Sequence, residues 1–210
     1  MENKAIIGRK LGMTQIFDET GLVVPVTVVA AGPMTVVRKK TNERDGYQAL
    51  VCAFEDVAER KLSKPAMGQF KKAGLAPKKI LKEFRFANDY EIGAEIKCDV
   101  FASGEMVDVS GMTKGRGFSG AIKRWNQHRL KMTHGTGPVH RERGSTGANS
   151  TPSKVIKGLH MAGQYGHEKV TIQNLKIVKV DADRNVLLIR GAVPGPKGAI
   201  LSIKTACKGK

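Results

Sequence analysis

The residue types with the greatest capacity for chemistry are concentrated between residues 108 and 169. Between Asp108 and Glu142 the chain has no carboxylate, yet it carries the basic residues Lys114, Arg116, Lys123, Arg124, Arg129, Lys131 and Arg141. Glycines are also dense there, from Gly111 to Gly147. Because the segment cannot neutralise its own charge, and because glycine permits unusual backbone angles, we expect a partner that supplies negative charge and shape. A nucleic-acid backbone supplies both.

A glycine pattern in this segment raises the possibility of nucleotide binding. The run Gly115-Arg116-Gly117-Phe118-Ser119-Gly120 matches the G-x-G-x-x-G pattern of dinucleotide sites. Such a site also needs a parallel βαβ unit and an acidic residue about 20 positions further on. No carboxylate follows until Glu142, and no Gly-Lys-Ser/Thr sequence closes a phosphate loop. The glycines therefore indicate close approach of the backbone to phosphates that the neighbouring Lys and Arg residues neutralise.

All five histidines lie in the same basic segment: His128, His134, His140, His160 and His167. His134 and His140 are separated by five residues, but no cysteine or further ligand accompanies them, so we predict no metal site. Polar rings among arginines suit contact with RNA sugars and bases. The alternative is that these histidines are solvated loop residues.

Trp125 is the only tryptophan of the chain and stands between Lys123 and Arg129. A tryptophan usually belongs to a core, but this one lies among charges. We therefore predict that Trp125 packs against nucleotides or anchors the base of the basic segment.

The sequence offers little for catalysis. It contains no G-x-S-x-G, no H-E-x-x-H and no closely spaced pair of acids near a histidine. Glu142 and Glu168 are isolated among basic residues, which favours a role as salt-bridge partners. We predict a protein that is not an enzyme and needs no cofactor. An RNA-modifying or RNA-cleaving enzyme, and a regulatory nucleic-acid module, remain the alternatives.

The composition points to the same class of partner. The 210 residues carry a net charge of +17 with a pI near 10.0, as expected of nucleic-acid binders. No apolar run approaches the roughly 18–20 residues of a membrane-spanning helix, and the N-terminus lacks a secretory h-region. Cys52, Cys98 and Cys207 are odd in number and scattered, which suits a reducing compartment. We therefore expect a cytoplasmic protein with no membrane partner.

The elements that must position these residues are mainly strands. A hairpin is expected from strands at 14–18 and 22–29 around the turn Glu19-Thr20-Gly21, with Pro25 at an edge position or a bulge. Further strands are expected at 34–38, 47–54, 95–101, 106–109, 170–181, 185–189 and 199–204. Two lysine-rich stretches, Ala66 to Ala73 and Pro77 to Phe86, have helical spacing and predict a pair of solvated surface helices.

Strands occur on both sides of the glycine-rich stretch, so the parts before and after it are expected to share one fold. We predict a mainly β protein with some α structure: an antiparallel β-barrel, with a sandwich as the alternative, formed by residues 1–110 and 170–210. A small α-containing insertion lies at about residues 56–92. Residues 111–169 form a long basic extension that orders against its partner.

Several ordered sequence blocks resemble those of the ribosomal protein L3 family of the large subunit. The N-terminal block is Ile7-Gly8-Arg9-Lys10-Leu11-Gly12-Met13-Thr14-Gln15-Ile16-Phe17, and the central block runs from Lys114 to Gly120 with Ile122-Lys123-Arg124 after it. The match continues with Thr133-His134-Gly135, Gly144-Ser145, Thr151-Pro152, Lys157-Gly158, Met161-Ala162-Gly163 and Gly191-Ala192-Val193-Pro194-Gly195. The chain is similar to the bacterial form in length.

The resemblance implies a fold and a set of partners. It implies a barrel of the kind seen in translation factors, and an extension that threads into the large-subunit rRNA toward the peptidyl transferase centre. It also implies binding early in assembly, contacts with neighbouring ribosomal proteins L14 and L19, and no homo-oligomer.

The resemblance also implies which residues bind. The expected rRNA-binding residues are Arg9, Lys10, Lys114, Arg116, Lys123, Arg124, Trp125, His128, Arg129, Lys131, His134, His140, Arg141, Arg143, Lys154 and Lys157. The tip of the extension is expected at Gly147, Ala148, Asn149, Ser150 and Thr151. Some bacterial members carry a methylated glutamine where this chain has Ser150, so that modification is not expected here. The pair Glu142-Arg143 stands where many relatives have a more neutral, proline-containing stretch.

Overall fold

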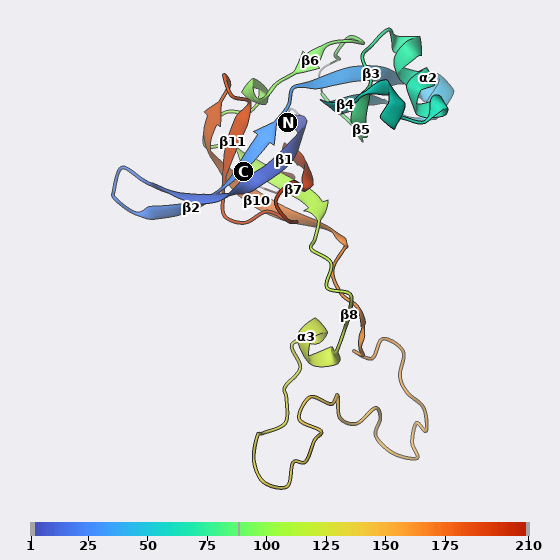
Figure 1. Cartoon of the computed structure of the whole chain (residues 1–210), viewed down its shortest axis with the longest axis vertical. Helices are drawn as coiled ribbons and strands as arrows, with labels where there is room; N and C mark the ends of the chain where they lie inside the picture. Colours follow the sequence, from blue (N-terminus) through green and yellow to red (C-terminus); the bar gives the residue numbers. More distant parts are fainter. Residues whose placement is uncertain (1–2, 88, 209–210) are drawn as a thin grey trace. The chain divides into compact units, whose positions relative to one another are not determined.

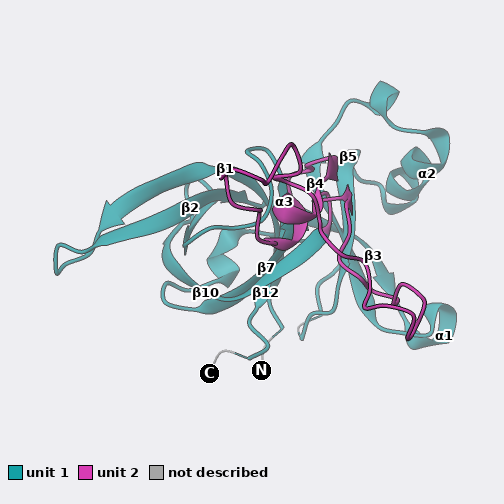
Figure 2. Cartoon of the chain, turned by 90° about the horizontal axis from the view of Figure 1, so that it is seen from below, with its two compact units in different colours: residues 1–112, 169–210 teal, residues 113–168 magenta. Residues whose placement is uncertain are grey.

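The chain divides into two compact units that are coloured separately in Figure 2. The computed structural model describes residues 3–87 and 89–208. Unit 1 comprises residues 1–112 and 169–210, and unit 2 comprises residues 113–168. Unit 1 is therefore built from two parts of the chain that lie on either side of unit 2 in sequence.

A closed antiparallel barrel forms the centre of unit 1 (Figure 1). Its strands follow one another around the barrel in the order β1 (Ala5–Phe17), β12 (Ile200–Thr205), β7 (Met106–Met112), β10 (Lys169–Asp181), β11 (Val186–Arg190) and β2 (Val23–Ala31). The prediction of a mainly β fold with an antiparallel barrel is confirmed.

Alternating apolar residues fill the barrel. On β11, Leu187 and Ile189 are fully buried, and on β12 Leu201 and Ile203 are fully buried, because every second side chain of a strand points inward. Gly8 lets β1 approach β2 closely, since a Cβ at that position would lie 2.6 Å from the Val29 side chain. Most of the buried apolar residues of unit 1 belong to one continuous core.

The predicted hairpin is present and continues beyond the barrel. β1 pairs with β12 only as far as Arg9, whereas its pairing with β2 continues to Phe17 opposite Val23. Pro25 lies opposite Gln15, just outside the stretch where β11 pairs with β2, so it takes the edge position that its missing N–H requires. The bulge of this hairpin lies between Lys10 and Gly12 and not at Pro25.

A second, four-stranded sheet lies between β2 and β7 in the chain. Its order is β5 (Lys78–Phe84), β4 (Ala49–Asp56), β3 (Met34–Lys40) and β6 (Glu95–Ile96). The short helices α1 (Asn42–Asp45) and η1 (Glu59–Lys61) lie between strands of this sheet, whereas η2 (Cys98–Val100) follows β6 and leads to β7. The strand expected over 95–101 is thus limited to Glu95–Ile96, because the chain turns into η2.

The prediction of a helix over residues 77–86 is wrong, because this segment forms β5. Ile80, Leu81 and Phe84 fit the stripe of a helix, but the sheet has apolar groups on both faces. Ile80 and Phe84 pack against the main core, whereas Leu81 packs against a small cluster beneath α2. A strand covered on both faces shows no clean alternation, so its sequence resembles a buried helix.

The other predicted helix, over 66–73, is confirmed as α2 (Lys64–Ala73). Pro65 stands in the first turn, and Gly74 ends the helix in the left-handed conformation. α2 is more than a solvated surface helix, because Phe70 is fully buried against Val37 and Ala53 of the second sheet.

Unit 2 contains little regular structure. It holds β8 (Phe118–Ser119), α3 (Ala121–Trp125) and β9 (Gly163–Gln164), with a long trace between α3 and β9 in Figure 1. Within the described ranges 3–87 and 89–208, no helix has both the length and the apolar character needed to cross a bilayer.

Replacing Phe70 by alanine tests the packing of α2. We expect Phe70→Ala to lower the free energy of unfolding by about 3–5 kcal/mol, because it leaves a cavity between α2 and the second sheet. Chemical denaturation followed by circular dichroism measures this change. Lys72→Ala on the same helix is the matched control and should stay within about 0.5 kcal/mol of the parent. Equal stability of the two variants would contradict the packing.

Candidate nucleic-acid interface

Unit 2 concentrates the charge of the protein. Its 56 residues carry 10 Lys and Arg but only two acids, Glu142 and Glu168, a difference of +8 out of the chain's +17. Every Lys and Arg of this unit is exposed except Arg124 and Arg143, which are half-buried. The strongest basic field of the chain therefore lies on groups that water, or an anionic partner, can reach.

The two units differ in the number of ion pairs that they contain. Unit 1 holds the pairs Lys4–Glu105, Arg9–Glu55, Arg38–Asp45, Lys39–Asp89, Lys40–Glu83 and Lys78–Asp56. Within residues 113–168, all of which the structure describes, no ion pair forms. The prediction that Glu142 and Glu168 act as salt-bridge partners is wrong, because neither carboxylate lies within 4.0 Å of a basic group among the residues that the structure describes. The positive charge of unit 2 is thus uncompensated inside the unit.

The G-x-G-x-x-G run lies in a two-stranded ribbon at the start of unit 2. Arg116 N donates to Tyr165 O at 2.8 Å, and Tyr165 N donates to Gly117 O at 2.9 Å. β8 and β9 then pair antiparallel, with Phe118 opposite Gln164. A dinucleotide site needs these glycines in a turn between a parallel strand and a helix, so this geometry excludes it.

Gly166 allows the two sides of the ribbon to meet. Its φ is +70°, and a Cβ there would lie 2.1 Å from the carbonyl oxygen of Lys114. No other residue type fits this position without moving the backbone. The close approach explains how two glycine-rich segments run together despite having almost no apolar side chains to bury.

Trp125 anchors one part of unit 2 to another. Its ring stacks on His160 with centroids 4.1 Å apart and planes 6° apart, and its Nε1 donates to Met161 O at 2.9 Å. The Arg124 guanidinium lies 4.8 Å from the tryptophan ring centre. Of the two predicted roles for Trp125, these contacts support the anchor.

The backbone carbonyls of His160 and Met161 accept hydrogen bonds from further side chains. Arg143 Nε donates to His160 O at 2.9 Å, Gln127 Nε2 donates to the same oxygen at 3.4 Å, and Arg124 donates to Met161 O at 3.3 Å. The sequence reasoning missed the contributions of Gln127 and His160 as anchors. Their partners lie more than thirty positions away in the chain, so no local pattern marks them.

The other predicted binding residues of unit 2 lie on its surface. Exposed positions are Lys114, Arg116, Lys123, His128, Arg129, Lys131, His134, Arg141, Lys154 and Lys157, and His140 is half-buried. The predicted tip, Gly147, Ala148, Asn149, Ser150 and Thr151, is exposed. Ser145 Oγ donates to Gly147 O at 2.7 Å, and Asn149 forms a bridge with Pro152, so the tip residues form a compact turn.

Arg9 and Lys10 belong to β1 of unit 1, and both side chains make contacts within the fold. Lys10 is 9% exposed, and its Nζ donates to Val193 O at 2.8 Å and to Gly195 O at 3.0 Å. These bonds hold the segment after β11 against the barrel. The prediction that Lys10 contacts RNA conflicts with this burial, because its ammonium is hydrogen-bonded to two backbone carbonyls of the same fold. Arg9 forms an ion pair with Glu55.

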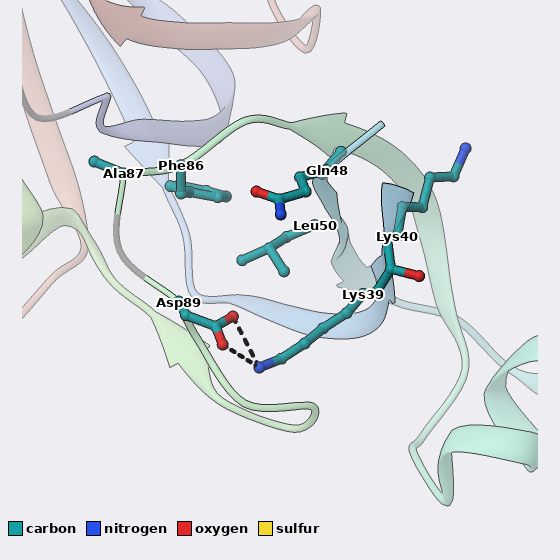
Figure 3. Close-up of a pocket in the computed structure, with 9 residues that line it drawn as sticks. Lys39, Lys40, Gln48, Leu50, Phe86, Ala87 and Asp89 are labelled. Atoms are coloured by element: carbon teal, nitrogen blue, oxygen red, sulfur yellow. Dashed lines mark hydrogen bonds and ion pairs between the residues drawn. The ribbon is translucent and has the colours of Figure 1, made fainter. Parts of the chain in front are cut away.

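Unit 1 also contains a pocket and three free thiols. A pocket of about 330 Å³ is lined by Lys39 and Asp89, which are ion-paired with each other, and by Gln48, Leu50 and Phe86 (Figure 3). All three cysteines are free, and burial raises the pKa of the Cys52 thiol to about 12, so it stays protonated. Among residues 3–87 and 89–208, no three His, Cys, Asp or Glu side chains come together as metal ligands would.

The chain is a β-barrel protein with a long basic segment inserted between two strands of the barrel. Comparison with known proteins makes the class specific. The model of the family described as ribosomal protein L3 matches residues 53–185. A protein named large ribosomal subunit protein uL3, from Acetivibrio thermocellus, is 52% identical over 210 residues, which cover 99% of each chain. The chain belongs to the ribosomal protein L3 family, which confirms the resemblance of its motifs.

Replacing Lys10 distinguishes a structural role from a binding role. We expect Lys10→Ala to lower the free energy of unfolding by about 1–3 kcal/mol, because the buried Val193 carbonyl loses its charged donor. Chemical denaturation measures the effect, and the exposed Lys179→Ala on β10 is the control. Unchanged stability together with weakened RNA binding would restore the original prediction for Lys10.

The stack of Trp125 on His160 can be followed by fluorescence, because the chain has one tryptophan. In His160→Ala the indole loses its stacked ring, so we expect a red-shifted emission and stronger quenching by acrylamide. The exposed His134→Ala should leave the spectrum of the parent unchanged. An identical spectrum for the two variants would show that the stack does not form in solution.

Proposed function

We propose that this protein is a non-enzymatic structural constituent of the large ribosomal subunit that binds large-subunit rRNA directly. The observation that carries the proposal is the uncompensated charge of unit 2, where ten basic residues face two acids and form no ion pair. Membership of the ribosomal protein L3 family and the name of the relative from Acetivibrio thermocellus support the same partner. The protein would act on the ribosome, in the cytoplasm.

The mechanism is neutralisation of phosphates by exposed cations. Each phosphate contact releases condensed counterions from the RNA, and this release supplies much of the binding free energy. Exposed side chains such as Lys114, Arg129 and Lys157 can each approach a phosphate without first breaking an ion pair. Arg124 uses one donor of its five-donor guanidinium on a backbone carbonyl and keeps further donors for RNA.

Glycine and ring contacts complete the binding surface. The glycine-rich backbone can lie close to the sugar–phosphate chain, where a side chain would block contact. The exposed rings of His128 and His134 can donate to or stack on single-stranded bases. Trp125 holds the backbone at His160 and Met161 in place, which limits the entropy that unit 2 loses when it binds.

The barrel fixes where the extension begins. Met112 and Lys169 lie opposite each other in the pairing of β7 with β10, so both ends of the extension start from one position. From there we propose that residues 113–168 extend into the rRNA, with Gly147 to Thr151 nearest the peptidyl transferase centre. The peptide-bond chemistry then belongs to the RNA, and the protein needs no cofactor or metal.

We further propose that the protein binds early and nucleates subunit assembly, with ribosomal proteins L14 and L19 as neighbours and no homo-oligomer. An extension that orders around rRNA brings separated RNA segments together, which an assembly initiator must do. Contacts with the neighbouring proteins would fall to unit 1, because unit 2 is occupied by RNA.

The salt dependence of rRNA binding tests the proposal. We expect affinity for large-subunit rRNA to fall steeply between about 50 and 200 mM salt, and the RNA to remain intact. Replacing Arg129, Lys131 and Arg141 together by glutamine should reduce the slope of log K against log salt by about two to three. Filter binding and denaturing gels provide the two measurements.

A control with the same change of charge makes this test specific. Lys71, Lys72 and Lys179 are exposed in unit 1, and replacing all three by glutamine should change the slope by less than about one. Equal effects of the two triple variants would show that net charge, and not unit 2, governs binding. Cleavage or modification of the RNA would show that the protein is an enzyme.

A further inference from the structure

A second cluster of cations lies within unit 1. Lys82 of β5, Lys169 of β10 and Lys204 of β12 line one pocket of about 410 Å³. Ser110, Gly111 and Ser202 form part of the same lining. The three lysines come from positions up to 122 residues apart, so only the packing of β5 beside the barrel strands brings them together.

Hydroxyl groups form part of this pocket. Lys82 Nζ donates to Ser202 Oγ at 2.9 Å, and because that oxygen accepts, the Ser202 O–H proton is left to point elsewhere. Ser110 lies opposite both Ser202 of β12 and Thr171 of β10 in register, and its hydroxyl is 2.7 Å from that of Thr171. This pair shares one hydrogen bond and therefore keeps one hydroxyl proton free to donate.

The charge of the three lysines is not neutralised by nearby acids. Among residues 3–87 and 89–208, none of the three forms an ion pair within 4.0 Å. Glu83 also lines the pocket, but its carboxylate pairs with Lys40 at 2.8 Å and accepts from Tyr47 at 2.7 Å. Asp108 lies opposite Lys204 in register, but its two oxygens accept from the Asn174 and Cys207 backbone N–H groups.

The electrostatics of Lys82 reflect this arrangement. Burial lowers the pKa of its ammonium, and repulsion from Lys169 and Lys204 lowers it further. Lys204 is held over the Phe84 ring, 5.6 Å from its centre, so it stays beside the cluster. Three like charges around one pocket repel one another. A bound anion would be attracted to all three ammonium groups and would offset this repulsion.

We propose that Lys82, Lys169 and Lys204, together with the hydroxyls of Ser202 and Ser110, form a binding site for a phosphate group. Three ammonium groups supply the charge, and the hydroxyl protons supply directed hydrogen bonds to a tetrahedral oxyanion. The two chemical sources are a phosphodiester of an RNA backbone and free inorganic phosphate. The RNA source rests on the proposed function, whereas the phosphate site itself does not.

An RNA phosphate here would give the barrel its own contact with RNA. The site uses outward-facing residues of β12, β7 and β10 and one residue of the second sheet. Contact at this point would bind unit 1 to RNA independently of residues 113–168. The protein would then hold RNA through both of its units.

Binding of rRNA by a cluster variant tests the RNA source. We expect replacement of Lys82, Lys169 and Lys204 by glutamine to weaken binding of the full chain about three- to tenfold near 150 mM salt, and to reduce the salt slope by about one. The triple variant of Lys71, Lys72 and Lys179 carries the same charge change and should weaken binding less than about twofold. Thermal melting shows whether each variant is folded.

Ser202→Ala is a second variant that keeps all three charges. It removes one hydroxyl donor, so we expect a loss of affinity smaller than that of the triple-lysine variant but larger than that of Ser103→Ala, a control on an exposed turn. The RNA source would be overturned by two results together. Ser202→Ala would weaken RNA binding no more than Ser103→Ala, and the two triple variants would bind RNA equally.

Direct titration separates the sources. The amide signals of Ser110 and Ser202 in nuclear magnetic resonance spectra should shift on addition of inorganic phosphate at constant ionic strength, and the cluster variant should lose this response. Saturation by a short single-stranded RNA at lower concentration than inorganic phosphate supports the RNA source, and the reverse order supports free phosphate. No response to phosphate, or a stronger response to polyglutamate, would overturn the site.

These results are distinguishable from a failure of the proposed function. If the parent protein binds rRNA and both triple variants bind equally, the phosphate site is not used by RNA and the proposed function stands. If the parent protein does not bind rRNA, the proposed function fails, and the titration with inorganic phosphate still decides whether the site exists.

Discussion

The pairing of β7 with β10 joins two strands that the whole of unit 2 separates along the chain. Lys169 lies opposite Met112, and the register continues to Lys176 opposite Met106. Without this pairing the barrel would not close, because β7 and β10 are neighbours in the ring of six strands. The entropy lost in closing a loop grows only slowly with its length, by about 0.6 kcal/mol for each doubling. The buried side chains of the barrel, such as Val109, Ile177 and Ile203, offset that loss, so the fold tolerates a long insertion with almost no core of its own.

The two units also differ in how their positive charges are balanced. Unit 1 holds six ion pairs among its described residues, and even the buried Lys10 is satisfied by two carbonyl oxygens. Exposed pairs such as Lys39–Asp89 contribute at most about 1 kcal/mol each, but they reduce the field around the barrel. Unit 2 has no such pairs and keeps its order through backbone bonds and the Trp125–His160 stack. Its stability in isolation therefore depends on few interactions, and its charge favours an anionic partner.

Particular residues show how far the sequence could be read. The β1–β2 hairpin and α2 followed from local signals: Glu19-Thr20-Gly21 marks a turn, and Pro65 and Gly74 bracket a helix. β5 was predicted as a helix because its apolar residues Ile80, Leu81 and Phe84 do not alternate as in a half-buried strand. They lie on both faces of the strand, since one face packs on the cluster beneath α2 and the other on the main core. Arg9 and Lys10 were placed with the binding residues because they stand in a block that resembles the L3 family, although the Lys10 ammonium is held by the Val193 and Gly195 carbonyls.

The expectation of an anionic partner follows from the sequence alone, because net charge and the absence of acids between Asp108 and Glu142 do not depend on how the chain folds. Family membership also rests on sequence, since its motifs are read in order along the chain. Which basic groups are available was decided only by the tertiary structure. Tertiary packing bonds the Lys10 ammonium to the segment at Val193 and brings Lys82 to Ser202 across 120 positions of sequence. Exposure and clustering are properties of contacts between distant residues, and no local pattern encodes them.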